Sequence, residues 1–338
     1  GKNAGFAVTT GIDNTLIGGL AGDSLTTGSY NVAMGRGALG ADTLGSSTVA
    51  IGFGALDAQN FTSATDSYNT AVGRSAGGAV TTGTKNTLIG GLSGDSITTG
   101  IGNVAVGYLS GEAITSGNNN VAIGNVALES STTASNNVAI GAAALRESTT
   151  ATDNVAVGAY ALGSSTTGNN NVAVGDSAGL DLTTGTINTL IGSSAGANLI
   201  SGNSNVAVGY LALSDDTLGD RNVAIGVGAL QSQNFASTTD SYNIGIGYDT
   251  GTSITTGTQN TLMGGLTGDA ISTGSTNTFI GYGASQGTVT GNSNSSLGAR
   301  SGYNVTSGSN NAFLGTDSGR TGSPGGAITT QSNRIVLG

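Results

Sequence analysis

Residues that could carry acid–base or covalent chemistry are few in this chain, and they do not gather. The 338-residue sequence has no His and no Cys, so the side chains most used as general bases, nucleophiles and thiolate ligands are absent. Its 19 Asp and Glu residues are scattered, and Lys2 and Lys85 are its only lysines. We therefore assign no catalytic and no cofactor-binding residue, and we expect that the chain is not an enzyme.

Three Gly-Asp pairs are the best candidates for metal ligands, because carboxylate oxygens bind calcium. They are Gly22-Asp23, Gly94-Asp95 and Gly268-Asp269, which share one phase of the repeat described below. They do not fall on successive repeats, and the GGxGxD nonapeptide of calcium-binding β-rolls is absent. The segments GFG at 52–54 and GYG at 281–283 lack the Lys of a phosphate-binding loop. We interpret all of these as solvated turn acids and turn glycines, and we assign no metal site.

The composition narrows the classes of partner. Gly accounts for 61 residues, charged residues for only 8% and hydrophobic residues for 36%, which does not fit disorder caused by high charge and low hydrophobicity. A net charge of −10 with nine Lys and Arg argues against nucleic acid as a partner. The sequence contains no run of about 18 apolar residues, so it predicts no membrane-spanning helix. The chain starts at Gly1 without an initiator Met or a signal peptide, and we interpret it as a segment of a longer or processed chain.

One glycine recurs at a nearly constant interval, and we call it the anchor glycine. It ends the apolar phrases NNVAIG at 136–141, NVAVG at 154–158 and NNVAVG at 170–175. Sixteen of the 19 intervals between anchors are 17 residues, two are 21 and the last is 23. Positions are given below relative to the anchor, so that −4 lies four residues before it. The anchors are Gly1, Gly18, Gly35, Gly52, Gly73, Gly90, Gly107, Gly124, Gly141, Gly158, Gly175, Gly192, Gly209, Gly226, Gly247, Gly264, Gly281, Gly298, Gly315 and Gly338.

Other positions at fixed distances from the anchor keep the same residue types in the 18 repeats from Gly18 to Gly315. Asn stands at −4 in 17 of them, with Thr48 as the exception, and Ile, Val, Leu or Met stands at −1 in all. Position −7 is Gly in 14 repeats, and position +3 is always Ala, Ser or Thr. Short Val- and Ile-rich runs flanked by Gly and Asn are typical of strands bounded by turns. We expect both glycine positions to supply backbone with positive φ, and Asn at −4 to form a bend or to bond neighbouring backbone.

Each repeat is predicted to be one coil of a parallel β-solenoid, or β-roll, with two short strands and two turns. In NNVAIG, Asn137 opens the strand, Val138 and Ile140 fill one face, and Ala139 keeps the other face shallow. We expect one face to fill the coil and the other, small or apolar, to meet a partner chain, because a 17-residue coil has a thin core. Stacked coils would pair their strands in parallel. The predicted fold is all-β, with about 19 coils in a single continuous domain over residues 1–338.

The side-chain volumes at positions +4 and +7 compensate for each other, which is typical of a close-packed interior. Leu at +4 goes with a polar residue at +7 in seven repeats, as in Leu128 with Ser131. Gly at +4 goes with an aliphatic residue at +7 in ten repeats, as in Gly111 with Ile114. Each coil is therefore expected to supply one large aliphatic side chain here, from one of two places.

The two 21-residue coils, at 52–73 and 226–247, are the best candidates for recognition, because a longer loop on a regular scaffold is a natural contact surface. They belong to a ten-coil unit that is duplicated at an offset of 174 residues, and a third longer coil spans 315–338. The alternative is a tolerated insertion that the duplication copied. The candidate recognition residues are Asn60, Phe61, Asp66, Tyr68, Asn234, Phe235, Asp240 and Tyr242. The nine Tyr residues are also candidates for the outer surface.

The segments NNVAIGAAAL at 136–145 and NVAVGAYALGSSTTGNN at 154–170 resemble the head repeats of trimeric autotransporter adhesins. They are equally similar to the Gly- and Asn-rich repeats of phage tail fibres, and the resemblance covers the whole chain. It implies a left-handed parallel β-roll, three chains side by side, an elongated shape and a role in attachment, with no catalytic residues. The 17-residue period is longer than that of the adhesin heads.

These observations favour a structural fibre or attachment protein, part of a tail fibre or a bacterial surface adhesin. The expected partners are two further copies of the chain, as a homotrimer, and a host or surface receptor, with a glycan as one candidate. The expected location is extracellular, on a cell surface or a virion. Two alternatives stay open. Thr-Thr-Gly recurs in six coils, at 26–28, 81–83, 98–100, 166–168, 183–185 and 255–257, so a monomeric ice- or surface-binding solenoid is one, and a self-assembling extracellular matrix fibre is the other.

Overall fold

The structure is a computed structural model that describes residues 1–287, 289–323 and 326–338. These residues form two compact units, 1–169 and 170–338, and each is described by itself. The described residues of both units form strands, turns and bends without a helix, so the predicted all-β class is confirmed. None of them forms a helix that could cross a membrane. The predicted longer coil at 315–338 includes residues 324–325, which lie outside the described residues.

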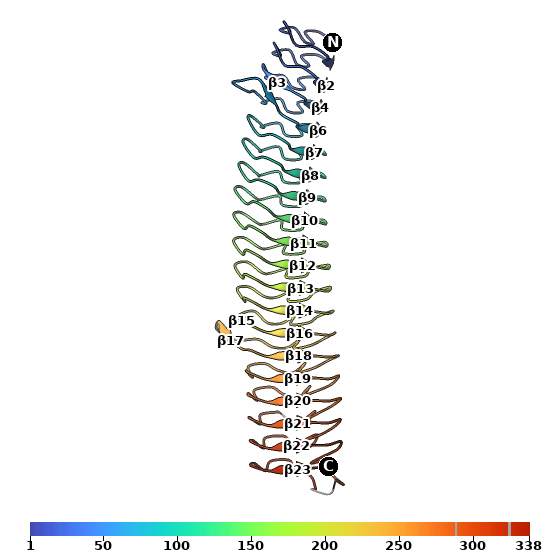
Figure 1. Cartoon of the computed structure of the whole chain (residues 1–338), viewed down its shortest axis with the longest axis vertical. Coiled ribbons are helices and arrows are strands. Elements are labelled where there is room, and N and C mark those ends of the chain that lie inside the picture. The colour runs from blue at the N-terminus through green and yellow to red at the C-terminus, as the bar shows by residue number, and fades with distance from the viewer. Residues whose placement is uncertain (288, 324–325) are drawn as a thin grey trace. The chain divides into compact units, whose positions relative to one another are not determined.

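Unit 1 has one three-residue strand per coil, and neighbouring strands pair in parallel with the repeat in register. Val138 pairs with Val121 of the previous coil and with Val155 of the next. This register is that of a parallel β-solenoid with a 17-residue period, which confirms the prediction (Figure 1). The strands are β1 (Thr15–Ile17), β2 (Val32–Met34), β4 (Val49–Ile51), β6 (Thr70–Val72), β7 (Thr87–Ile89), β8 (Val104–Val106), β9 (Val121–Ile123), β10 (Val138–Ile140) and β11 (Val155–Val157).

Unit 2 repeats this arrangement. Thr189 of one coil pairs with Val172 of the coil before it and with Val206 of the coil after it, again in parallel. The strands are β12 (Val172–Val174), β13 (Thr189–Ile191), β14 (Val206–Val208), β16 (Val223–Ile225), β18 (Ile244–Ile246), β19 (Thr261–Met263), β20 (Thr278–Ile280), β21 (Ser295–Leu297), β22 (Ala312–Leu314) and β23 (Ile335–Leu337).

The prediction of two strands in every coil is wrong, because ordinary coils turn where the second strand was expected. Residues at −5, +2 and +4 have positive φ, for example 61° at Asn136 and 50° at Leu145, and this bends the backbone too tightly for an extended segment. Hydrogen bonds between coils persist in these turns, as from the Leu145 N–H to the Ala161 carbonyl at 3.0 Å. Within residues 1–287, 289–323 and 326–338, a second strand pair forms only beside the 21-residue coils. These pairs are β3 (Gly45–Ser46) with β5 (Thr65–Asp66), and β15 (Gly219–Asp220) with β17 (Thr239–Asp240).

The small residue at −2 fills the coil, and the larger pair at −3 and −1 lies outside, so the expectation that the small face meets a partner chain is wrong. Ala139 is fully buried, Val138 is half-buried and Ile140 is 37% exposed. The reason is the volume already inside the coil. Where Leu stands at −2, as at Leu88, the +4 residues next to it are glycines, and a Cβ on Gly94 would come within 2.7 Å of a Leu88 methyl carbon.

The predicted exchange between +4 and +7 is confirmed by burial. Leu128 at +4 of one coil and Ile114 at +7 of the preceding coil are both almost fully buried, and the same holds for the other Leu and aliphatic residues of the pattern except Val8 of the first coil, which is half-buried. Leu128 achieves this with a φ of 53°, a conformation that costs most side chains about 1–2 kcal/mol. Burial of a Leu side chain contributes roughly 1.5–3 kcal/mol, which outweighs that strain.

Asn at −4 forms a buried ladder along the coils. The Asn137 N–H donates to Asn120 Oδ1 at 3.1 Å, and Asn137 Nδ2 donates to the Ala151 carbonyl at 2.8 Å. Asn137 is fully buried, so each coil pairs these amide groups with its neighbours instead of with water. The expectation that this Asn bonds neighbouring backbone is confirmed. The left-handed bend lies one residue earlier, at Asn136.

Glycine stands at the anchor and at −7 for two different physical reasons. The anchor Gly141 has a φ of 137°, as expected, and a Cβ there would lie 2.3 Å from the Gly158 carbonyl oxygen. The glycine at −7 does not have positive φ in the repeats that keep it, so that part of the prediction is wrong. It is small because coils approach closely there, and a Cβ on Gly100 would lie 2.5 Å from the Gly117 oxygen.

Candidate functional site

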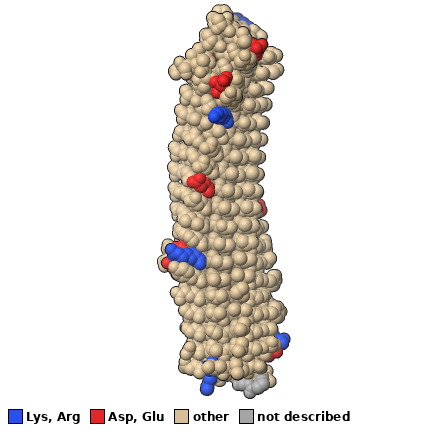
Figure 2. Space-filling view, viewed as in Figure 1, with Lys and Arg blue, Asp and Glu red and all other residues tan. Residues whose placement is uncertain are grey.

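One candidate surface in each unit is the outward side of the three-residue strands, which we call the outer strand face. It consists of the residues at −3 and −1 of every coil. In unit 1 the exposed fraction is 40% at Ile89, 37% at Ile123 and 37% at Ile140. None of the residues at these positions is charged, and tan atoms dominate the view of Figure 2. An uncharged aliphatic surface that continues from coil to coil is typical of a protein–protein contact.

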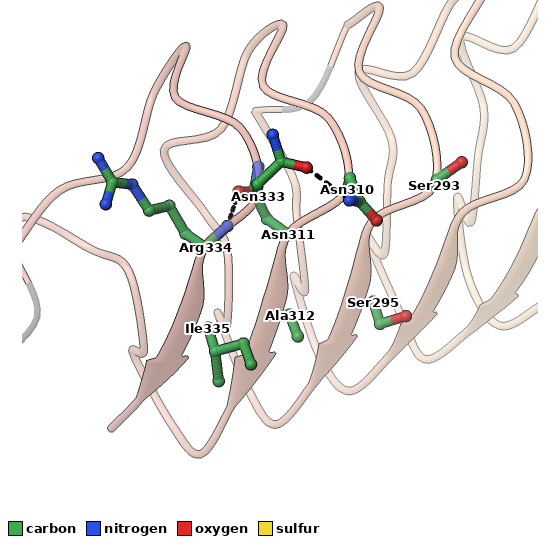
Figure 3. Close-up of a pocket in the computed structure, with 8 residues that line it drawn as sticks. All are labelled: Ser293, Ser295, Asn310, Asn311, Ala312, Asn333, Arg334 and Ile335. Atoms are coloured by element: carbon green, nitrogen blue, oxygen red, sulfur yellow. Dashed lines mark hydrogen bonds between the residues drawn. The ribbon is translucent and has the colours of Figure 1, made fainter.

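In unit 2 this face has a hollow near its C-terminal strands. Ser295 and Ala312 stand at −3, where most coils carry Val or Thr, and their small side chains leave a space of about 370 Å³ bounded by Ile280, Leu314 and Leu337. A more polar space of about 340 Å³ adjoins the same strands (Figure 3). The hollow offers an aliphatic floor for an apolar group.

The polar side of the adjoining space of about 340 Å³ comes from the turn before each strand. Asn310 and Asn333 stack at −5, and Asn310 Nδ2 donates to Asn333 Oδ1 at 2.6 Å (Figure 3). Arg334 takes the −4 position, which Asn holds in every earlier repeat from Gly18 except that of Thr48, and its N–H donates to Asn311 Oδ1 at 2.9 Å. The hollow was not predicted from the sequence. The available signals were the loss of Val or Thr at 295 and 312 and the Arg in place of Asn at 334.

The 21-residue coils do not expose all of the residues predicted for recognition. Phe61 and Phe235 are 5% and 6% exposed, so their rings anchor the loops inside and offer no surface to a receptor. Tyr68 and Tyr242 are 58% and 48% exposed. The remaining predicted residues are exposed, and two of them accept hydrogen bonds from the previous coil. Asn60 accepts one from Thr43 Oγ1 and Asn234 one from Thr217 Oγ1, both at 2.9 Å.

The exposed residues of the two long coils differ in charge. In unit 1, Ser47 Oγ donates to Asp66 Oδ1 at 3.0 Å. In unit 2, Arg221 stands at the matching position, forms an ion pair with Asp240, and lies over the Tyr242 ring at 5.7 Å from its centroid. The structure therefore brings Asp240 and Tyr242 together through an arginine that the sequence analysis did not select. The duplication preserved the loop but not its surface.

Beneath each long coil lies a buried polar network that the sequence analysis also missed. Gln59 Nε2 donates to Asp42 Oδ2 at 2.7 Å, and Asn69 Nδ2 donates to Gln59 Oε1 at 2.8 Å. Asp42 Oδ1 accepts a bond from the Gly45 N–H at 2.9 Å. Burial raises the pKa of Asp42 although these hydrogen bonds oppose the shift. The network fixes β3 and the start of the long loop, so its role is structural.

A row of hydroxyl groups follows another side of unit 1. Thr stands at +8 in six successive coils, and each of the first five donates its Oγ1 to the carbonyl of the next, as from Thr98 to Thr115 at 3.1 Å. Exposed Thr or Ser residues stand beside them at +9. The row consists of Thr81, Thr98, Thr115, Thr132, Thr149 and Thr166.

Among the residues that the structure describes, no three His, Cys, Asp or Glu side chains lie close enough to hold a metal ion. Comparison with protein-family models, with curated proteins and with solved structures finds no match to this chain.

Proposed function

We propose that this chain is a structural fibre and attachment protein, an elongated homotrimeric rod of a phage tail fibre or a bacterial surface adhesin. It would act outside the cell and present binding surfaces to a host or surface receptor. The observation that supports this most is the outer strand face, which repeats without a charged residue through the three-residue strands of each unit.

The physical argument is the cost of leaving that face in water. Each coil exposes parts of two side chains that are mostly aliphatic, and burial of apolar surface contributes about 25 cal/mol per Å². The contributions add along the coils, because parallel register keeps every −3 and −1 residue on the same side. Three chains that share this face would bury it, and the long coils, whose tyrosines and acids are exposed, would remain available to a receptor. Several identical binding loops on one particle would then raise avidity.

The mass of the particle in solution tests the assembly. The chain has a mass of 32.5 kDa, and we expect light scattering after gel filtration to give three times this value without dissociation on dilution. Ile123→Glu combined with Ile140→Glu places two charges on the outer strand face and should give a monomer. Thr82→Glu combined with Thr99→Glu, on exposed positions away from the strands, should leave the trimer intact. A wild-type monomer, or equal effects of the two variants, would contradict the proposal.

A second candidate is a monomeric ice-binding solenoid, and the threonine row of unit 1 favours it. The row is unbroken over six coils, with hydroxyls spaced by about 4.8 Å along the coils. Inhibition of ice recrystallisation by the wild-type protein tests this candidate. Thr99→Asn with Thr133→Asn, at the exposed +9 positions, should abolish the inhibition if ice binds there. Absence of inhibition in the wild-type protein would eliminate the candidate.

A further inference from the structure

Three exposed tyrosines of unit 2, which we call the tyrosine row, are not explained by the assembly proposed above. Tyr210, Tyr248 and Tyr282 each follow an anchor glycine directly, at +1. Their exposed fractions are 54%, 60% and 62%, although Tyr side chains usually bury much of their ring. Nothing in the described structure covers them.

The tyrosine row occupies every second coil. Tyr210 follows β14, Tyr248 follows β18 and Tyr282 follows β20, whereas β16 and β19 are followed at +1 by Val227 and Gly265. Because β14, β16, β18, β19 and β20 pair in that order, successive tyrosines are two strand spacings apart. At about 4.8 Å per strand, the rings repeat every ~9.6 Å along unit 2.

The residues between the tyrosines leave the rings accessible. A Cβ on Gly265 would lie 3.7 Å from Cδ2 of Tyr282, so the ring leans with one edge over this glycine. A larger residue at this position would crowd the space between two rings. The +1 column of unit 1 has no such alternation, because Tyr108 has Arg74 two coils before it and Ala142 two coils after it.

The charges around the row favour an uncharged ligand. Asp249 follows Tyr248, and it raises the pKa of the Tyr248 phenol, mainly through a hydrogen bond. Arg300 stands at +2 of the coil after Tyr282, but its guanidinium is held by Asp317 at 2.9 Å. No Lys and no other Arg stands at +1 or +2 beside the row. An anionic polymer would therefore meet a carboxylate and no free cation.

We propose that the tyrosine row binds an extended, uncharged glycan of the β-1,4-linked type, with its chain parallel to the column of strands. In such a ribbon each pyranose ring is turned over relative to the next, so that every second ring presents the same face. The length that one sugar ring adds to the chain is about equal to the spacing between neighbouring coils. Because the tyrosines are two coils apart, every second sugar ring meets the next tyrosine. The C–H groups on a ring face rest on the aromatic ring, and the hydroxyls at its rim can bond the phenol and the Asp249 carboxylate. The proposal rests on the attachment function above, and it names the class of receptor.

Calorimetric titration with cellohexaose tests the proposal, because six β-1,4-linked glucose rings span all three tyrosines. We expect binding that weakens steeply in cellobiose, which can cover only one tyrosine, and no binding of maltohexaose, whose α-1,4 linkages curve the chain. Tyr248→Ala should lower the affinity by roughly 5- to 150-fold, since stacking on an aromatic side chain has this order of effect for nucleobases. The triple variant of Tyr210, Tyr248 and Tyr282 to Ala should not bind.

Tyr108→Ala is the matched control, since Tyr108 is 56% exposed at +1 of unit 1 and leans on Gly91 in the same way. It should bind cellohexaose like the wild-type protein. All four positions are on the surface, and an unchanged circular dichroism spectrum shows that the variants fold. Absence of binding, equal binding of maltohexaose, or an equal loss in Tyr108→Ala would overturn the proposal.

The mass measurement separates this proposal from the attachment fibre itself. A trimer that does not bind cellohexaose would refute the tyrosine row and leave the fibre assembly standing. A monomer that binds cellohexaose through the three tyrosines would support the row and refute the trimeric rod.

Discussion

Gln59 and Asp42 lie inside unit 1 without exposure to solvent, and Gln59 Nε2 donates a hydrogen bond to Asp42 Oδ2 at 2.7 Å. Gln233 and Asp216 repeat the relationship in unit 2 at 2.6 Å. In both units the amide of the following −4 asparagine, Asn69 or Asn243, donates to the glutamine oxygen at 2.8 Å. A carboxylate is thus held in a coil by amides alone, without a cation, directly beneath each long loop.

Replacing the glutamine is expected to destabilise unit 1. Gln59→Leu leaves Asp42 Oδ2 and one Asn69 N–H without this partner in the interior, and each lost partner costs about 1–3 kcal/mol. Urea unfolding should therefore show a loss of roughly 2–6 kcal/mol. Gln259→Leu, at an exposed position, is the control and should change the free energy of unfolding by less than about 0.5 kcal/mol. Similar values for the two variants would mean that the network contributes little.

The same carboxyl groups predict how stability depends on pH. Burial raises the pKa of Asp42 and Asp216 above the ordinary value of 3.8, so the folded chain holds these protons at pH values where the unfolded chain has released them. Their contribution to stability is fully present below the unfolded pKa and is lost as pH rises through the folded pKa. We expect a higher urea midpoint at about pH 4 than at about pH 7.

Removal of both carboxyl groups tests the origin of that slope. The variant Asp42→Asn with Asp216→Asn should show a flatter dependence of the urea midpoint on pH, whatever its absolute stability. Lower net charge at acid pH also relieves repulsion, so Asp57→Asn, which removes an exposed carboxyl, serves as the control. An unchanged dependence of the urea midpoint on pH in the double variant would show that other groups cause it.

The exchange between +4 and +7 can be tested by converting one type of coil into the other. Leu128→Gly should cost about 2–5 kcal/mol through a cavity, and Ser131→Ile about 1–3 kcal/mol through overpacking. The double variant recreates the Gly111 and Ile114 pattern of the preceding coil and should recover most of the loss. Because the Ser131 hydroxyl is buried without a hydrogen-bond partner, its removal adds no further cost. Additive effects in the double-mutant cycle would contradict the compensation.

The asparagine ladder is expected to stabilise the stacking of coils. Asn120 Nδ2 donates to the Ala134 carbonyl at 2.8 Å, and its Oδ1 accepts the Asn137 N–H at 3.1 Å. Asn120→Ala should lower the free energy of unfolding by roughly 1–3 kcal/mol, because both groups are left buried without these partners. Asn125→Ala, at an exposed position in the next turn, should have almost no effect in the same urea titration. An equal effect of the two would show that the ladder is not a source of stability.

Much of this surface could not be read from residue types. Phe61 looked like a receptor contact because large apolar residues in a longer loop often face a partner, yet it fills the space that the extra residues open. Arg221 stands outside the long loop in sequence but reaches Asp240 and Tyr242 because the coils stack. The tyrosine row was visible only as scattered aromatics until the coil register aligned Tyr210, Tyr248 and Tyr282.

The amino-acid sequence by itself determined the repeat, the strand at −3 to −1, the parallel stacking and the exchange of volume between +4 and +7, since all of these are periodic and local. Alternation along the strand also showed that Val138 and Ile140 share one face and Ala139 the other. Only the tertiary structure decided which face lies inside. The positive φ angles at −5, +2 and +4 curve each coil so that Ala139 points to an interior already filled by Leu128 and Leu145, and the larger pair remains outside.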